Sequence, residues 1–176
     1  LAPEDLNIQI DTCDPLALGY VEAFKQNDIN VPNPPEFALA EYLSAFYEPE
    51  SKDVITCNNA LDHCIDPIRA INEMLRVLKV GGAIICSHHR NEGQKAKYVG
   101  LHQFNIDTEN SEVIIWNTTA KYFLSQSLLI NTQIKLLKDD DWVTFKIYKL
   151  EEFSKEELLE NSNSHLREIL LGIIKN

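Results

Sequence analysis

The sequence contains no long apolar run and has few positive charges. Its longest apolar runs, such as Leu128-Leu129-Ile130, fall far short of the roughly 18–20 residues that a membrane-spanning helix needs. The first residues are acidic, unlike those of a secretory signal. Sixteen Lys and Arg stand against 27 Asp and Glu, which gives a net charge of −11. Such a surface repels phosphate backbones, so we expect neither a membrane nor a nucleic acid as partner.

Cysteine and glycine are also scarce. No two of the four cysteines form a CxxC pair, so neither a zinc knuckle nor a redox motif is supported. We expect reduced cysteines that pack as small apolar side chains in a cytoplasmic protein. No Gly-x-Gly-x-Gly loop is present. The six glycines are Gly19, Gly81, Gly82, Gly93, Gly100 and Gly172.

The first half of the sequence alternates between strand and helix patterns. Apolar and polar residues alternate over 7–14, which predicts a strand, and apolar residues at helical spacing follow from Pro15. A short β-branched run over 53–57 predicts a strand buried on both faces. A helix capped by Asp66 and a second strand over 83–86 complete a β-α-β unit, which implies parallel strands.

The second half is richer in hairpin patterns. We expect one hairpin from 103–106 and 113–116, a helix over 121–129, and a second hairpin from 133–137 and 142–150. Ser154 and Glu157 form a capping-box pattern that begins a helical tail. The sequence therefore predicts an α/β domain over residues 1–150, with a hairpin insertion and an antiparallel last strand, and a helical tail over 151–176.

Two stretches resemble a known family. Residues 53–67 (DVITCNNALDHCIDP), running into Arg76-Val-Leu-Lys-Val-Gly-Gly and the following strand, are similar to class I S-adenosylmethionine-dependent methyltransferases. Val80 replaces the proline that is customary in the family. The resemblance implies a doubly wound, Rossmann-like sheet. It also implies that S-adenosylmethionine is the cofactor.

The resemblance also implies which residues contact the cofactor. Asp14, at the end of the second family strand, would bind the ribose hydroxyls, with Asp11 as second choice; Asp14 is also placed to cap the helix after Pro15. The backbone around Ala40 and the Glu41 carboxylate would contact the adenine, although a surface glutamate is an alternative for Glu41. The methionine part would meet Asn58 and Asn59, and Leu61 would flank the adenine or the sulfonium.

The family's glycine-rich loop precedes the Asp14 strand, and nothing in this chain corresponds to it. The chain also begins with Leu1 rather than Met. We therefore expect the methyltransferase sheet to be incomplete at its N-terminus and an upstream part of the same polypeptide to supply the loop. The chain by itself should then bind S-adenosylmethionine weakly or not at all.

The most individual segment runs from 88 to 103, after the last strand of the β-α-β unit. Its three histidines, His88, His89 and His102, are candidates for a general base that deprotonates an oxygen or nitrogen nucleophile. A divalent metal site and a plain polar loop are alternatives, although no spacing fixes a set of metal ligands. Asp62 and His63 could touch the cofactor or substrate, or be structural.

These observations favour methyl transfer from S-adenosylmethionine to a small-molecule or glycan-type acceptor. The reaction would be an in-line displacement at the sulfonium methyl, with the protein supplying orientation and, where needed, a base. The alternative is a non-catalytic methyltransferase-like module that serves binding or assembly in a larger protein. A nucleotide-binding dehydrogenase is disfavoured by residues 76–82. The oligomeric state cannot be predicted from the sequence.

Overall fold

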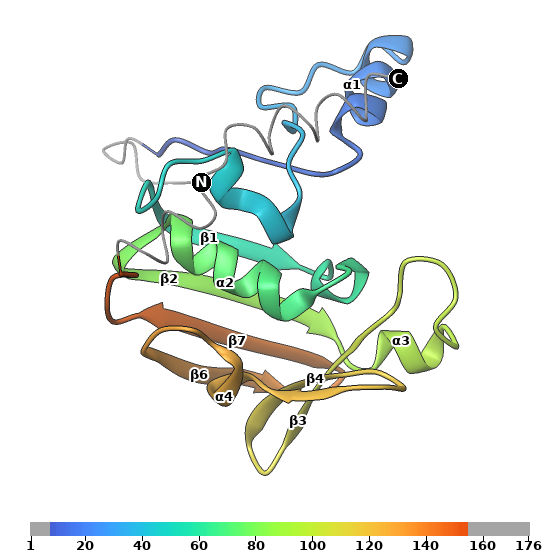
Figure 1. The fold of residues 1–176 in the computed structure, drawn as a ribbon. Coiled ribbons are helices and arrows are strands. Elements are labelled where there is room, and N and C mark those ends of the chain that lie inside the picture. The colour runs from blue at the N-terminus through green and yellow to red at the C-terminus, as the bar shows by residue number, and fades with distance from the viewer. Residues whose placement is uncertain (1–7, 155–176) are drawn as a thin grey trace. The chain divides into compact units, whose positions relative to one another are not determined.

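The computed structural model describes residues 8–154 (Figure 1). The chain divides into two compact units, Leu1–Leu39 and Ala40–Asn176. In the first unit, helix α1 spans Ala17–Gln26, as the apolar spacing predicted. It follows a turn in which Oδ1 of Asp14 accepts a hydrogen bond from the backbone N–H of Leu16, at 2.7 Å. No helix or strand is formed over 27–35, which is rich in proline and asparagine.

The strand expected over 7–14 is wrong for its described part. Cys13 forms a single isolated parallel bridge with Glu36, and Ile8 and Ile10 are more than half exposed. Alternation favours an extended chain, but a strand also needs a neighbour with free backbone donors and acceptors. The segment before Glu36 is rich in proline, which has no N–H to donate, so the pairing cannot extend in that direction.

The second unit is built on a four-stranded sheet in the order β1-β2-β7-β6 (Figure 1). Its strands are β1 (Lys52–Asn58), β2 (Leu78–His89), β6 (Thr132–Asp139) and β7 (Trp142–Lys149). β1 and β2 are parallel and are joined by helix α2 (Pro67–Val77), which confirms the predicted β-α-β unit. β7 is antiparallel to both β2 and β6, which confirms the antiparallel last strand and the second hairpin.

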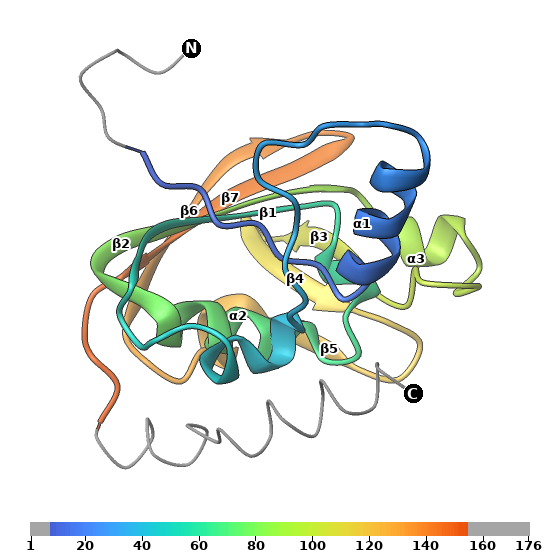
Figure 2. The same cartoon turned by 90° about the horizontal axis from the view of Figure 1, so that it is seen from above.

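Helix α2 lies against one face of this sheet (Figure 2). It begins as predicted, because Oδ1 of Asp66 accepts a hydrogen bond from the backbone N–H of Arg69 and Pro67 occupies the first turn. Ile71 and Leu75 are fully buried in the core. The helix also packs against the 3₁₀ segment η1 (Ala40–Ala45). This packing fixes the position of α2, which connects β1 to β2.

Two expectations for these strands need correction. β1 is not buried on both faces: it is the edge strand, and Val54 is 57% exposed. A short apolar run cannot reveal whether the chain supplies a neighbour on each side. The second strand also begins earlier than expected, at Leu78, and runs through Gly81 and Gly82 as a bulge. Lys52 pairs with Leu78 and Val54 with Ala83, so β2 accommodates extra residues between these pairs.

A three-stranded antiparallel sheet follows β2 in the chain. β3 (Asn105–Glu109) and β4 (Glu112–Trp116) form the first predicted hairpin, and β5 (Lys121–Phe123) pairs with β4. The helix predicted over 121–129 is therefore wrong in its first turn and is reduced to α4 (Leu124–Ser127), because 121–123 satisfies its backbone on β4. A short helix, α3 (Glu92–Lys95), precedes β3. The predicted tail over 151–176 lies mostly outside the described residues.

Candidate active site

The carboxyl ends of the parallel strands β1 and β2 meet at one edge of the sheet. Asn58 ends β1 opposite Ser87, and the backbone N–H of Asn59 donates to the carbonyl of Ser87 at 2.9 Å. Asn59 adopts a left-handed conformation with φ of 48°, which asparagine tolerates better than most residues. Its Oδ1 accepts a hydrogen bond from the backbone N–H of His89 at 3.1 Å. Ligands in open α/β sheets bind outside such strand ends, so this edge is the candidate site.

Two segments that are distant in the sequence meet beyond the carboxyl ends of β1 and β2. The 3₁₀ turn η2 (Leu61–His63) carries Asp62 and His63. The backbone carbonyl of Asp62 accepts hydrogen bonds from the N–H groups of Gln103 and Phe104, at 2.9 and 3.3 Å. These backbone bonds fix the segment that carries His102 against the turn.

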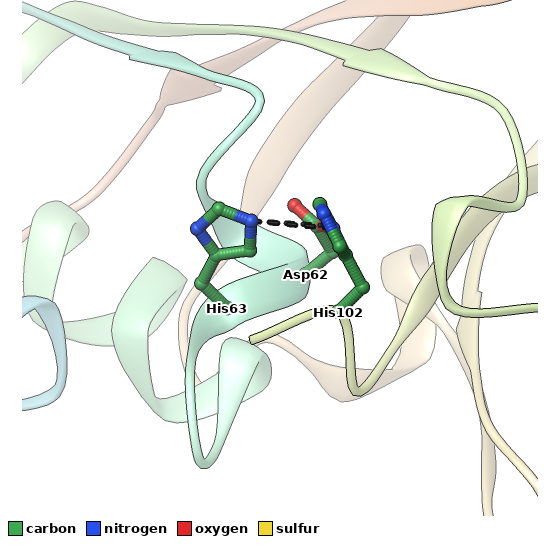
Figure 3. Close-up of side chains that lie close together, drawn as sticks. All are labelled: Asp62, His63 and His102. Atoms are coloured by element: carbon green, nitrogen blue, oxygen red, sulfur yellow. Dashed lines mark hydrogen bonds and ion pairs between the residues drawn. The ribbon is translucent and has the colours of Figure 1, made fainter. Parts of the chain in front are cut away.

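The side chains of Asp62, His63 and His102 form a compact cluster (Figure 3). Nδ1 of His102 lies 2.6 Å from Oδ2 of Asp62 and 3.3 Å from Nε2 of His63, and the third separation, between Nε2 of His63 and Oδ2 of Asp62, is 3.5 Å. The Asp62 side chain is 2% exposed, whereas each imidazole is 33% exposed. A buried carboxylate therefore supports two rings that reach solvent.

The Asp62–His102 contact has a chemical consequence. When Nδ1 of His102 donates its hydrogen to the carboxylate, Nε2 is left as the nitrogen that can accept a proton. The carboxylate also stabilises the imidazolium that forms, as in other acid–histidine pairs. The sequence named His102 as a base candidate but did not identify its partner. The only signal for this partner in the sequence was the Asp62-His63 pair, which follows the strand predicted over 53–57.

The other two predicted histidines are placed differently. His88, near the end of β2, is fully buried, and neither ring nitrogen has a hydrogen-bond partner among the described residues. The half-buried ring of His89 packs on Trp142, with 3.9 Å between ring centroids. The structure therefore pairs His102, and neither of the other two, with a carboxylate among the described residues.

Two thiols lie side by side on the paired strands. Cys57 of β1 is the register partner of Cys86 of β2. A hydrogen bond from Cys86 is the main cause that lowers the pKa of Cys57 to about 6, and the neighbouring His88 contributes. The pKa of Cys86 is raised, because its proton is shared with Cys57 and because the thiol is buried. No sequence pattern indicated this pair.

The remaining predicted cofactor residues are partly committed to structural roles. Glu41 is buried, and its Oε1 accepts hydrogen bonds from the backbone N–H groups of Ile65 and Asp66, at 2.8 and 3.4 Å. Leu61 is fully buried, so its side chain offers no surface to a ligand. Ala40 is half-buried at the start of η1, and Asn58 is exposed. Among these residues, Asn58 is the one whose side chain is open to a ligand.

Two surface hollows lie away from the predicted residues. One has a volume of about 500 Å³ and belongs to the first unit, beside the end of α1. The other, of about 220 Å³, lies between α4, β4 and β6. Neither is lined by any residue of the candidate site.

The sequence of the first half of the chain matches a known family model. Residues 9–86 match the model described as "Methyltransferase domain". This part of the chain is similar to that family. The match ends at Cys86, so it includes α1, the β-α-β unit and the Asp62–His63 turn, but not His88, His89 or His102. S-adenosylmethionine is the cofactor of class I methyltransferases. A comparison with the curated proteins finds no match.

Two solved structures with a TM-score of 0.50 show the same fold at low sequence identity. The PH0226 protein of Pyrococcus horikoshii OT3 is 14% identical, with a TM-score of 0.50 over 84% of this chain and 74% of that one. The CurJ carbon methyltransferase is 13% identical, with a TM-score of 0.50 over 79% of this chain and 41% of that one. The [4+2]-cyclase SpnF is 23% identical, with a TM-score of 0.40; this chain covers 33% of its length. The chain thus has the Rossmann-like α/β fold of class I methyltransferases and spans a third of the length of the cyclase.

No helix within residues 8–154 is both long and apolar enough to cross a membrane.

Proposed function

We propose that this protein transfers a methyl group from S-adenosylmethionine to a small-molecule or glycan-type acceptor, and that the acceptor is deprotonated at the cluster of Asp62, His63 and His102. The observation that carries the proposal is the contact between Asp62 and His102, which lies directly after the ends of β1 and β2. The family match over residues 9–86 supports the methyl donor. The acidic net charge of −11 favours a small or uncharged acceptor over a nucleic acid.

The donors present suit parts of the cofactor. The exposed amide of Asn58 at the strand end can hydrogen-bond the amino-acid part. The Asp14 carboxylate has the two oxygens that a ribose diol needs, although Oδ1 also accepts from Leu16. When bound, S-adenosylmethionine supplies the electrophilic methyl group. Ala40, Glu41, Asn59 and Leu61 stay predicted contacts, of which Glu41 and Leu61 have the weaker geometric support.

The proposed role of this chain's own residues is to orient the acceptor and accept its proton. An acceptor hydroxyl or amine becomes a better nucleophile as its proton moves to Nε2 of His102. Asp62 holds the ring in the required tautomer and offsets the positive charge that develops. The partly exposed ring of His63 lies beside His102 and limits where an acceptor can bind. His88 and His89 stay alternative bases, although the complete burial of the His88 ring argues against His88.

A second candidate function is a non-catalytic methyltransferase-like module. The exposed edge strand β1, with Val54 57% exposed, favours it, because an unpaired edge can accept a strand from another part of a larger protein. In either case we propose a cytoplasmic location. The free thiols of Cys57, Cys64 and Cys86 suit a reducing compartment.

The test is methyl transfer by the natural polypeptide from labelled S-adenosylmethionine to a panel of hydroxyl- and amine-bearing acceptors. His102→Gln should lower turnover by about 10²–10⁴-fold while the affinity for S-adenosylmethionine is unchanged. Gln94→Ala, which removes an exposed side chain of α3, is the control and should retain full turnover. Binding of the cofactor without transfer to any acceptor would favour the non-catalytic module.

A further inference from the structure

In the cluster of Asp62, His63 and His102, three atoms that can act as metal ligands lie close to one another. Nδ1 of His102 lies near both Oδ2 of Asp62 and Nε2 of His63. A hydrogen on Nδ1 can bond the carboxylate, but Nδ1 then has no lone pair for His63. If His63 donates to Nδ1 instead, the lone pair of Nδ1 faces a carboxylate oxygen at 2.6 Å. Every arrangement of neutral imidazoles therefore leaves one of the three close contacts without a hydrogen bond.

The charge of Asp62 is also poorly compensated. Its side chain is almost completely buried, and Oδ1 has no hydrogen-bond partner among the described residues. The only ion-pair partners of Asp62 among residues 8–154 are the two histidines, which carry charge only when protonated. A buried carboxylate without a cation is costly, so the site favours a bound positive charge.

We propose that Asp62, His63 and His102 bind a divalent transition-metal ion through Oδ2, Nε2 and Nδ1. Two imidazoles and one carboxylate on one side of an ion are the ligand set of the facial triad and of three-ligand zinc sites. Ligands at about 2.0–2.2 Å from a metal lie about 2.9–3.6 Å from one another. The three separations of 2.6, 3.3 and 3.5 Å require only a small opening of the Asp62–His102 contact.

The surroundings of the cluster support a site of this kind. The turn η2 and the segment after His102 are joined through the backbone carbonyl of Asp62, so two ligands from distant parts of the chain are preorganised. The two rings are one-third exposed, whereas the carboxylate is buried. An ion at this position is therefore held from the protein side and keeps coordination positions open toward solvent. The nitrogen ligands favour Zn²⁺ or Co²⁺ over Mg²⁺ or Ca²⁺, which prefer oxygen.

The role of the ion rests on the proposed function, whereas its binding does not. On binding, the ion replaces the proton that Nδ1 of His102 shares with Asp62. It would then lower the pKa of an acceptor hydroxyl that occupies an open position, so that the hydroxyl loses its proton to solvent water in place of Nε2 of His102, which carries the ring hydrogen while Nδ1 is a ligand.

The test is titration of the metal-free chain with Co²⁺, whose visible absorption reports coordination. We expect one nitrogen- and oxygen-coordinated ion per chain, without the charge-transfer absorption of a thiolate ligand, which separates this site from the Cys57–Cys86 pair. His63→Gln and His102→Gln should each weaken binding by more than about 100-fold. His89→Gln removes an equally half-buried ring outside the cluster and should bind Co²⁺ like the parent chain. A hundredfold excess of Mg²⁺ should not displace Co²⁺.

Asp62→Asn tests the carboxylate, and thermal unfolding shows whether this buried variant is folded. His63→Gln, whose ring is more exposed, keeps the test valid if Asp62→Asn does not fold. The inference is overturned if the folded parent chain does not bind Co²⁺, or if His63→Gln and His102→Gln bind it unchanged. Metal binding without methyl transfer by the natural polypeptide would contradict the proposed function alone. Methyl transfer that persists in a chain shown not to bind Co²⁺ would contradict the metal site alone.

Discussion

Asp62 and His102 are 40 residues apart in the sequence, yet Oδ2 of the first lies 2.6 Å from Nδ1 of the second. Asp62→Asn should therefore lower turnover by about 10²–10⁴-fold, because an amide stabilises neither the required tautomer nor the imidazolium. The affinity for S-adenosylmethionine should be unchanged in isothermal calorimetry. Asp141→Asn, in an exposed turn, is the matched control. Full turnover in folded Asp62→Asn protein would remove Asp62 from the mechanism.

Cys57 should react with iodoacetamide faster than the other strand thiol at neutral pH. Its pKa of about 6 means that the folded protein holds a thiolate above that pH, so the alkylation rate should rise with pH and reach half its plateau near pH 6. The pKa of Cys57 in the folded protein lies below its ordinary value of 9.0, so the thiolate adds to the free energy of unfolding. This contribution is full above pH 9 and is lost as the pH falls toward 6. Mass spectrometry of the peptides measures the rate at each pH.

Cys86→Ala provides the matching control for the thiol pair. It removes the hydrogen bond that is the main cause of the shift, so the alkylation midpoint of Cys57 should move upward, toward 9.0. An unchanged midpoint would show that another group sets the pKa of Cys57.

Lys149 should contribute more to stability than an exposed ion pair does. Its ammonium group is fully buried, and it donates to Oε1 of Glu50 at 3.0 Å and to the carbonyl of Leu78 at 2.8 Å. Glu50→Gln leaves that charge without its carboxylate and should lower the free energy of unfolding by about 1–3 kcal/mol. Asp53→Asn breaks the exposed pair with Lys79 and should cost about 0–1 kcal/mol. Urea denaturation compares the two, and equal effects would contradict the prediction.

Gly82 and Gly19 should respond in opposite ways to alanine. A Cβ on Gly82 would lie 2.8 Å from the carbonyl oxygen of Asp53 and 2.9 Å from the Leu78 side chain, so Gly82→Ala should destabilise the second unit by about 1–3 kcal/mol. Gly19 has open space around it inside α1, and Gly19→Ala should stabilise the helix by about 0.5–1 kcal/mol. Chemical denaturation followed by circular dichroism measures both. A destabilising Gly19→Ala would show an unrecognised contact of α1.

Asp14→Ala separates the two roles predicted for that carboxylate. If Asp14 binds the ribose, the change should weaken S-adenosylmethionine binding by about 1.5–3 kcal/mol, provided that the parent chain shows measurable affinity. If it acts only as the acceptor for the Leu16 N–H, the stability of α1 falls and cofactor affinity does not change. Calorimetry and circular dichroism of the same variant distinguish the two results.

Much of the fold was predictable from local patterns. The capping geometry at Asp66 and Pro67 depends on neighbouring residues, and the structure reproduces it. The alternation of Val143, Phe145 and Ile147, all fully buried in β7, likewise follows from a period of two. The match of the sequence to a methyltransferase domain rests on contiguous stretches of the same kind.

The candidate site was predictable only in part. His102 is conspicuous in the sequence as a titratable group near a strand end, but its partner lies on a turn that precedes α2. The pairing depends on the backbone bonds from Gln103 and Phe104 to Asp62, which no local pattern encodes. For the same reason, the sequence could not separate His102 from His88 and His89.

The sequence by itself determined helices α1 and α2, the β-α-β unit and the similarity to the family, because each depends on the spacing of nearby residues. Tertiary structure alone decided which strand edges are paired and which polar groups meet. Residues 8–14 form an isolated bridge at Cys13 instead of a strand, and β1 is apolar but lies at the edge of the sheet. A strand is completed by hydrogen bonds to another segment, so its burial depends on the neighbours it finds. The cluster of Asp62, His63 and His102 exists for the same reason: contacts far apart in the sequence bring its three side chains together.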